Sequence, residues 1–343
     1  MTPTRIGVVG AGRAGAVHAR NIHGHTPDAE VACVIDPDLG RARELAAELG
    51  AAASGDLAAA LAEHRLDAVA IATPTFGHRD LAVTAAEHGA HVFIEKPLAL
   101  TLAECDDIIA AAERAGVILQ VGFVRRYQPE FAEAHARVEA GEIGDVMVIK
   151  SLTRGPGLPP AWAHDIALSN GMLAEVNSHD FDSVRWLAGS DIERVYTEVA
   201  NRKGERFGVT AEHFYDNAVV SLRFADGALG TVDGACPAEY GYDARVEILG
   251  TKGLLVIGEV SGSPLLMAVD RAKGGNRPVH KTWPDRFPLA YMAEMRAFVD
   301  AVRGGGEAEV TGLDGRRAVQ AVVAANRSWM QERPVRLDEV EGA

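Results

Sequence analysis

The stretch Gly7–Gly15, "GVVGAGRAG", decides how the first part of the chain folds. The apolar residues at its start predict a buried strand, and "AGAVHARNIHG" at its end predicts a helix. Between the two, Gly10, Gly12 and Gly15 form the pattern G-x-G-x-x-G, the glycine turn of residues 10–15. In such a turn the first glycine makes the tight bend, the second lets the backbone approach a diphosphate, and the third lets the helix pack closely on the strand. The stretch therefore predicts a dinucleotide-binding turn, in which free amides at the helix N-terminus bind the diphosphate.

Asp36 ends the next expected strand, "VACVIDP", about 20 residues after the glycine pattern. A carboxylate at this position accepts hydrogen bonds from ribose hydroxyl groups and repels a 2′-phosphate. The next residue is Pro37, not an arginine that could pair with such a phosphate. We therefore expect NAD as the cofactor. NADP remains an alternative because Arg41 and Arg43 lie close in the sequence, although both fit a solvated helix face equally well.

The pattern of apolar segments divides the chain into two domains. Up to residue 122, short strands such as "LDAVAIATP", "HVFIEKP" and "VILQVGF" alternate with alanine-rich helices, which indicates βαβ units on a parallel sheet. The later strands follow one another through short turns, which indicates an open, mostly antiparallel sheet. One helix is expected over residues 171–189, and the irregular segment 154–165 is an expected binding loop. We expect an α/β protein, with an N-terminal Rossmann domain, doubly wound on a parallel sheet, over residues 1–122 and a C-terminal α+β domain for substrate binding and oligomerisation over residues 123–343.

The composition excludes several classes of function. The formal net charge of −14 argues against a nucleic-acid partner, because a duplex is bound through a basic surface. No apolar run approaches the ~20 residues of a membrane helix, and the N-terminus lacks the pattern of a signal peptide. Cys33, Cys105 and Cys236 are too scattered for a disulfide framework or a zinc knuckle, so we expect reduced thiols in a cytoplasmic protein.

The segment Ala174–Asp182, "AEVNSHDFD", places an acid and an imidazole inside an expected helix. On one continuous helix Glu175, His179 and Asp182 would share a stripe, whereas Asp180 would point elsewhere. Glu175 and His179 could be solvated helix residues, two metal ligands, or the acid–base group of an enzyme. A zinc site needs more ligands, and no cluster of cysteine and histidine accompanies them. The enzyme is favoured, because a histidine that titrates near neutral pH suits the removal of a hydroxyl proton.

Four motifs carry a resemblance to a known family: "GAGRAG", "ATPTFGH", "EKPLALT" and "HDFDSVRWL". With them the chain resembles, over nearly its whole length, the family of glucose–fructose oxidoreductases, inositol dehydrogenases and rhizopine-catabolism oxidoreductases. "GFVRRY" and "CPAEYGYDARVEILGTKG" look most like the inositol 2-dehydrogenase branch. The resemblance implies that Lys96 lies beside the nicotinamide and the substrate, that Pro97 follows a cis peptide bond, and that His179 is the general acid/base. The family commonly has an aspartate four residues before this histidine, so Glu175 departs from the pattern by one methylene.

Motifs and resemblance together predict an NAD-dependent dehydrogenase that oxidises a secondary hydroxyl of a cyclic polyol or sugar, with an inositol as the first candidate. His179 would be the base, Lys96 would stabilise the developing alkoxide, and Glu175 would orient the histidine or bind a substrate hydroxyl. Two alternatives are a sugar-active enzyme that uses tightly bound NAD transiently and a non-catalytic sensor of NAD or sugar. The resemblance also implies a homodimer or homotetramer.

The residues expected to contact the cofactor come from the glycine turn and from the ends of three strands: Gly10, Gly12, Arg13, Ala14, Gly15, Asp36, Thr73, Pro74, His78, Glu95, Lys96 and Pro97. Those expected to contact the substrate combine the catalytic residues with arginine and aromatic side chains, which suit hydroxyl groups and sugar faces: Lys96, Arg126, Tyr127, Arg154, Trp162, Glu175, His179 and Tyr240. No residue is expected to bind a metal.

Overall fold

A computed structural model describes residues 2–258 and 280–342, and the chain divides into two compact units. The first unit comprises Met1–Tyr127 and Pro288–Arg316, and the second comprises Gln128–Phe287 and Arg317–Ala343. The first boundary lies close to the expected one after residue 122. The return of residues 288–316 to the first unit differs from the expected division into two continuous segments.

The first unit contains a six-stranded sheet in which every pair of neighbouring strands is parallel. Its order is β3-β2-β1-β4-β5-β6. The strands are β1 (Thr4–Val9), β2 (Ala29–Ile35), β3 (Ala52–Ser54), β4 (Ala68–Ile71), β5 (His91–Glu95) and β6 (Leu119–Gly122). This order confirms the doubly wound Rossmann fold, in which ligands bind at the carboxyl ends of the strands where the order reverses, here between β1 and β4. The three-residue strand β3 was not expected from the sequence.

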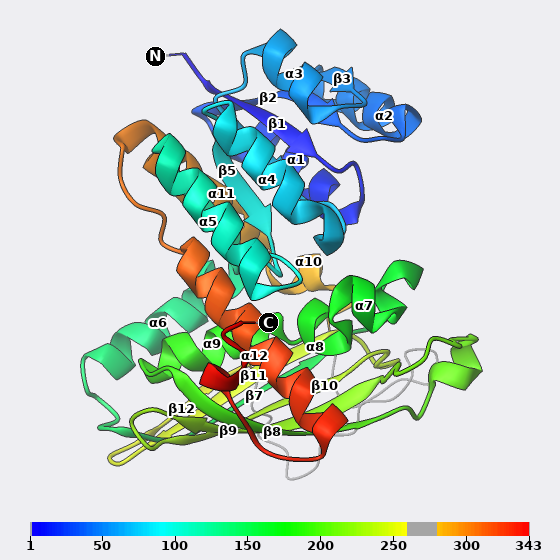
Figure 1. The fold of residues 1–343 in the computed structure, drawn as a ribbon. Helices are drawn as coiled ribbons and strands as arrows, with labels where there is room; N and C mark the ends of the chain where they lie inside the picture. Colours follow the sequence, from blue (N-terminus) through cyan, green and yellow to red (C-terminus); the bar gives the residue numbers. More distant parts are fainter. Residues whose placement is uncertain (1, 259–279, 343) are drawn as a thin grey trace. The chain divides into compact units, whose positions relative to one another are not determined.

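Two rows of neighbouring helices belong to this sheet (Figure 1). One row is α3-α4-α5 and the other is α2-α1-α11. The helices are α1 (Arg13–His25), α2 (Leu39–Leu49), α3 (Leu57–His64), α4 (His78–Glu87), α5 (Leu102–Ala115) and α11 (Pro288–Gly304), with short helices η1 (Thr75–Gly77) and η2 (Val124–Tyr127). Helix α11 joins this unit because its apolar face, formed by Met295, Phe298 and Val299, packs into the same core as Ile6 and Phe93. All five side chains are at most 1% exposed.

The second unit contains a seven-stranded sheet of order β12-β11-β7-β10-β9-β8-β13. The strands are β7 (Val146–Arg154), β8 (Ile192–Ala200), β9 (Asn217–Phe224), β10 (Leu229–Ala235), β11 (Asp243–Gly250), β12 (Leu254–Ile257) and β13 (Val335–Arg336). Neighbouring strands are antiparallel except β7 and β10, so the expectation of a mostly antiparallel sheet is confirmed. The expected Asp-Gly turn joins β9 to β10, where Gly227 has φ +97°.

Helices lie along one face of this sheet (Figure 1). They are α6 (Pro129–Glu139), α7 (Ile166–Ser169), α8 (Gly171–Glu175) and α9 (Ser178–Ala188), preceded by η3 (Ala161–His164); α9 packs on β7 and β10, and α6 packs on α9. This unit also contains three short helices: η4 (Gly204–Phe207), α10 (Trp283–Arg286) and η6 (Leu337–Val340). The long helix α12 (Gly312–Gln331) begins in the first unit and ends in the second.

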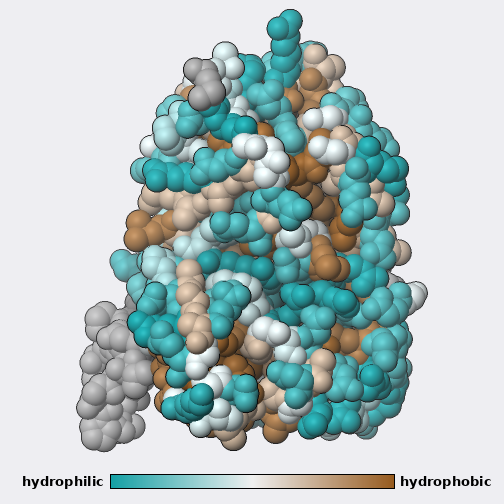
Figure 2. Space-filling model, turned by 90° about the vertical axis from the view of Figure 1, so that its left-hand side faces the viewer, coloured by the Kyte–Doolittle hydropathy of each residue, from teal (hydrophilic) through white to brown (hydrophobic). Residues whose placement is uncertain are grey.

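The other face of the second sheet carries an apolar stripe, formed by Leu254, Leu249, Val148 and Leu229 on four neighbouring strands in register. The three leucines are 40–53% exposed. The face of the molecule drawn in Figure 2 is largely hydrophilic, with hydrophobic side chains interspersed. None of the described helices is long and apolar enough to cross a membrane.

Candidate active site

The glycine turn has the geometry that its pattern predicts. Gly10 has φ +100°, and a Cβ atom added to it would lie 2.5 Å from the carbonyl oxygen of Ala72. A Cβ on Gly15 would lie 1.8 Å from the carbonyl oxygen of Gly10, so this position needs a glycine for close packing of α1. A Cβ on Gly12 would meet no atom within 4 Å. Gly12 therefore borders open space at the N-terminus of α1, whose first turn contains no acidic residue and whose amides are not capped by a side chain, so they are available to an anion such as a diphosphate.

Asp36 lies directly after β2 and is held by two backbone amides. Its Oδ2 atom accepts a hydrogen bond from the amide of Ala11 (2.8 Å), and its Oδ1 atom accepts one from the amide of Asp38 (2.8 Å). The carboxylate thus ties the glycine turn to the end of β2. Arg41 forms an exposed ion pair with Asp38 at 3.3 Å, and Arg43 is exposed. The turn and this fixed carboxylate fit NAD, with the carboxylate available to the ribose.

Lys96 follows β5 at the carboxyl edge of the same sheet, and the Lys96–Pro97 peptide bond is cis, as the resemblance implied. The Oε2 atom of Glu95 accepts a hydrogen bond from the Lys96 amide (3.1 Å), and its Oε1 atom lies 2.7 Å from Nε2 of His18 on α1. Burial alone would raise the pKa of Glu95, but the hydrogen bond and charge of His18 and the charge of Lys96 hold this pKa below its usual value. Glu95 is thus an anion that supports the segment Lys96–Pro97, the lysine turn, from its buried side.

His78 connects this turn to the loop that follows β4. Its Nδ1 atom lies 2.9 Å from the carbonyl oxygen of Pro97, and its Nε2 atom lies 3.0 Å from the carbonyl oxygen of Thr73. The side chain is buried, and burial lowers the pKa of His78, which these carbonyl groups only partly oppose. The structure therefore places His78 between two backbone segments, as a brace. Thr73 and Pro74 are partly buried in the loop that it holds.

The expected helix over residues 171–189 is interrupted, which corrects the geometry inferred from the spacing of Glu175 and His179. Helix α8 ends at Glu175, and α9 begins at Ser178. The interruption is at Asn177, whose fully buried side chain donates hydrogen bonds to Oδ2 of Asp180 (2.8 Å) and to the carbonyl oxygen of Asp233 (3.4 Å). Because the helix is not continuous, the four-residue spacing does not place both side chains on one stripe.

Asp180 anchors the first turn of α9 to β7. Its fully buried carboxylate accepts hydrogen bonds from the hydroxyl groups of Ser151 (2.5 Å) and Thr153 (2.7 Å) in addition to that from Asn177. Gly234 leaves room for this arrangement, since a Cβ there would lie 2.0 Å from Oδ1 of Asn177. The partly exposed His179 sits beside this anchor, which fixes the backbone that carries it.

Arg154 and Tyr240 belong to a polar cluster on the face of the sheet opposite α9. Arg154 forms an ion pair with Asp233, whereas its neighbours Ser151 and Thr153 on the other face reach Asp180. The hydroxyl group of Tyr240 donates to Oδ2 of Asp243 (3.0 Å), and burial followed by this carboxylate raises the pKa of Tyr240 to about 12. Alternate residues of a strand point to opposite faces, so the structure does not place the Arg154 side chain on the face that packs against α9.

The other expected substrate residues lie in two separate short helices, η2 and η3. Arg126, in η2, pairs with Asp314 at 3.0 Å, and both side chains are largely buried. Although burial alone would raise it, Arg126 and Thr311 hold the pKa of Asp314 below its usual value. Tyr127 ends the same short helix and is partly buried, and Trp162 is partly buried in η3 of the second unit.

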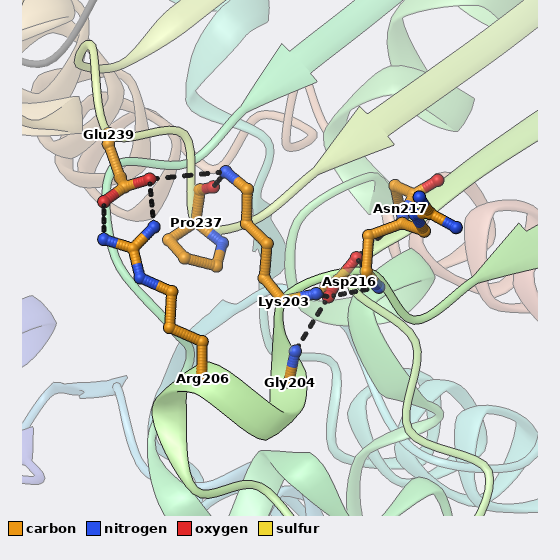
Figure 3. A network of polar contacts seen from close by, with 8 residues as sticks. Lys203, Gly204, Arg206, Asp216, Asn217, Pro237 and Glu239 are labelled. Atoms are coloured by element: carbon orange, nitrogen blue, oxygen red, sulfur yellow. Dashed lines mark hydrogen bonds and ion pairs between the residues drawn. The ribbon is translucent and has the colours of Figure 1, made fainter.

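A polar network that the sequence did not suggest fixes the loop before Tyr240 (Figure 3). Buried Asp216 accepts hydrogen bonds from the backbone amides of Lys203 and Gly204, and the Nζ atom of Lys203 donates to the carbonyl oxygen of Pro237 (2.7 Å). Glu239 pairs with Lys203 (3.8 Å) and with a neighbouring arginine. These contacts hold the segment that follows the cis bond Cys236–Pro237.

No group of three or more His, Cys, Asp or Glu side chains in residues 2–258 and 280–342 is arranged to hold a metal ion. The glycine turn, the Asp36 carboxylate and the lysine turn instead lie at the carboxyl ends of β1, β2 and β5 of one parallel sheet. They define a dinucleotide-binding oxidoreductase.

The chain belongs to the GFO/IDH/MocA family. Residues 4–123 match an oxidoreductase family with an NAD-binding Rossmann fold, and residues 131–256 match the GFO/IDH/MocA C-terminal domain. The protein is therefore an NAD-dependent oxidoreductase that acts on CH–OH groups. The resemblance seen in the four sequence motifs is confirmed.

Similar proteins cover nearly the whole chain. It is 37% identical to scyllo-inositol 2-dehydrogenase (NAD(+)) of Bacillus subtilis, over 97% of this chain and 96% of that protein. It is 34% identical to myo-inositol 2-dehydrogenase of Thermotoga maritima, over 98% of this chain and 100% of that protein. The crystal structure of scyllo-inositol dehydrogenase from Lactobacillus casei with NAD(H) and scyllo-inositol has a TM-score of 0.87 and 26% identity, over 98% of this chain and 100% of that one.

Proposed function

We propose that the protein oxidises a secondary hydroxyl group of a cyclic polyol, with an inositol as its substrate. The observation that carries this proposal is the lysine turn: Lys96 stands at the carboxyl edge of the sheet that also carries the dinucleotide turn, and Glu95 and His78 brace its backbone. The names of relatives that match over nearly the whole chain support an inositol rather than another alcohol.

In this proposal Lys96 and His179 are the two catalytic residues. NAD supplies the acceptor for the hydride that leaves the carbon atom. His179 takes the hydroxyl proton, and the ammonium group of Lys96 stabilises the negative charge that develops on the oxygen. The anchor formed by Asp180 keeps the start of α9 in place while His179 reacts. Glu175, the last residue of α8, binds a substrate hydroxyl or orients the imidazole, with a longer reach than the aspartate that the family commonly has.

The test is the formation of NADH with a panel of inositol isomers, aldoses and sugar acids. A general base contributes roughly 10²- to 10⁴-fold, so His179→Ala should lower kcat at least about 100-fold while inositol still binds. His213→Asn, a change of an exposed histidine in the same unit, is the matched control and should leave kcat unchanged. Absence of NADH formation with every polyol would overturn the proposed substrate, and turnover without accumulation of NADH would assign transient use of the cofactor.

We also propose that the protein forms a homodimer or homotetramer through the exposed face of the second sheet. The stripe of Leu254, Leu249, Val148 and Leu229 is an exposed apolar surface of the kind that obligate interfaces bury.

The three buried, free cysteines fit a reducing compartment, which supports a cytoplasmic location.

A further inference from the structure

A cluster of buried ionisable side chains adjoins Lys96 within the first unit. His18 is 1% exposed and Glu95 is 8% exposed, and they are joined by the 2.7 Å contact between Nε2 and Oε1. The rings of Phe93 (4.9 Å) and Tyr291 (5.7 Å) pack edge-on against the imidazole. Since a carboxylate only accepts hydrogen bonds, Nε2 of His18 carries the proton of this bond.

Glu294, on α11, is a second buried acid of this cluster. It is 0% exposed, and neither oxygen of its carboxyl group has a hydrogen-bonding partner among the residues that the structure describes. The side chain of Gln120, on β6, holds the helix at this point through a 3.1 Å bond to the backbone carbonyl of Glu294. Burial, followed by the negative charge of Glu95, raises the pKa of Glu294 well above its usual value.

Within residues 2–258 and 280–342, burial and the charge of Glu95 are the influences on the pKa of Glu294, and both raise it. The charge of Glu95, on β5, acts on the Glu294 carboxyl group, and the imidazole of His18, on α1, is already engaged by Glu95. The amide of Gln120, on β6, binds the backbone carbonyl of Glu294 and not its carboxyl group. The η2 segment that packs on α11 carries Arg125 and Arg126, and the second of these is paired with an aspartate. Neither arginine accounts for the pKa of Glu294, which burial and Glu95 determine. Two buried carboxylates in such a place cannot both be ionised, so one of them keeps its proton.

We propose that Glu95, His18 and Glu294 form a buried charge-compensating cluster that positions Lys96, in which Glu95 is the anion and Glu294 is an uncharged carboxylic acid. The inference rests on the catalytic role of Lys96 proposed above. Glu95 is fixed by His18 on one oxygen and binds the Lys96 amide with the other, so the cluster acts on the lysine through the backbone. When Glu294 loses its proton at high pH, a second negative charge appears beside Glu95 in a site without water access, and the lysine turn is destabilised.

The sign of the pH effect on stability follows from the proton that Glu294 keeps. In the folded protein the carboxyl group is protonated, whereas in the unfolded chain it ionises near pH 4.5. The contribution of this proton to the free energy of unfolding is therefore fully present below pH 4.5, and it is lost as pH rises toward the pKa of Glu294 in the folded protein. The equilibrium constant for unfolding should grow about tenfold per pH unit in this window, relative to a variant that cannot ionise there.

The experiment compares wild type with Glu294→Gln, which mimics the protonated acid, and with Asp300→Asn, which removes the same charge from an exposed position of the same helix. Denaturant unfolding from pH 5 to 9 should give Glu294→Gln a stability advantage that increases with pH, and the inositol-dependent kcat at neutral pH should stay within about twofold of wild type. The alkaline decline of kcat should move to higher pH in Glu294→Gln alone. If Glu294→Gln fails to fold, Glu294→Met replaces it in the same comparison. Identical pH dependence of stability in all three proteins would overturn the proposal.

A second variant tests the link to Lys96. Glu95→Gln should lower kcat at least about tenfold, with the Kd for NAD changed less than about threefold, because the change disturbs the lysine turn and leaves the glycine turn intact. An unchanged kcat would overturn the positioning role. The unfolding and NAD-binding measurements need no substrate, so they report on the cluster even if no polyol is oxidised, which would overturn only the proposed function.

Discussion

Replacement of Asp36 by Asn should change the preference of the enzyme between NAD and NADP. The carboxylate is held by the amides of Ala11 and Asp38 at 2.8 Å each, so its position is fixed before any cofactor binds. Hydrogen bonds from ribose hydroxyl groups to a charged acceptor contribute about 1.5–3 kcal/mol, and the variant loses this for NAD. A 2′-phosphate about 4 Å from the carboxylate is repelled by about 1–4 kcal/mol per charge, and the variant relieves this for NADP.

The two effects add, because one weakens NAD and the other strengthens NADP. Their sum, at least about 2.5 kcal/mol, corresponds to a change of the order of 100-fold in the ratio of kcat/KM for the two cofactors. The assay is initial-rate kinetics with each cofactor at saturating inositol. Asp38→Asn is the matched control, because it removes the same charge two residues away and Asn caps α2 as well as Asp does. The reasoning is refuted if Asp36→Asn changes the ratio less than threefold, or if Asp38→Asn changes it equally.

Three further substitutions test other parts of the structure. Gly15→Ala places a Cβ 1.8 Å from a backbone oxygen and should raise the Kd for NAD at least about tenfold by calorimetry, whereas Gly24→Ala, in open space on the same helix, should not. Asp180→Asn puts an amide donor against the hydroxyl donors of Ser151 and Thr153 in the buried anchor of α9. It should lower the free energy of unfolding by about 2–3 kcal/mol, measured with denaturant, and should also lower kcat. Unchanged kinetics would contradict the role of the anchor. Phe298→Ala empties a fully buried site against Phe93 and should cost about 3–5 kcal/mol, so a smaller loss in unfolding free energy would contradict the place of α11 in that core.

The fold of the first unit could be predicted from the sequence because its signals are local. The glycine turn, the acid after β2 and the apolar runs each specify a short segment, and parallel sheets with helical crossovers have few alternative topologies. The return of α11 could not be predicted in the same way. Its apolar face, with Met295, Phe298 and Val299, would fit any core, and only the assembled sheet shows which one it fills.

The candidate site was only partly readable from the sequence, because motifs name residues and do not give their neighbours. The cis bond before Pro97 is confirmed, and Asp36 and Lys96 directly follow β2 and β5, as the strand patterns predicted; their roles remain predictions. His78 was expected to line the nicotinamide pocket, and the structure shows that its ring is buried between two loops. The interruption at Asn177 carries no proline or glycine signal, since a buried tertiary contact causes it.

His18 and Glu294 were missed entirely. Each stands in a helical pattern where a histidine or a glutamate ordinarily faces solvent, and they lie far apart in the sequence. Burial of both follows from the packing of α11 beside α1, which is a long-range contact. A glutamate among the apolar residues of "LAYMAEMRAFV" was the only available signal, because it falls on the same helical face as the apolar positions that follow.

The position of α11 also has a consequence for the order in which the chain matures during synthesis. When the ribosome has made Met1–Tyr127, every strand of the nucleotide-binding sheet exists, but the apolar surface that α11 covers is still open. The whole of Gln128–Phe287 must emerge before that surface can close. The core of the first unit is therefore completed only after the second sheet has been synthesised, and until then its exposed apolar surface is open to aggregation.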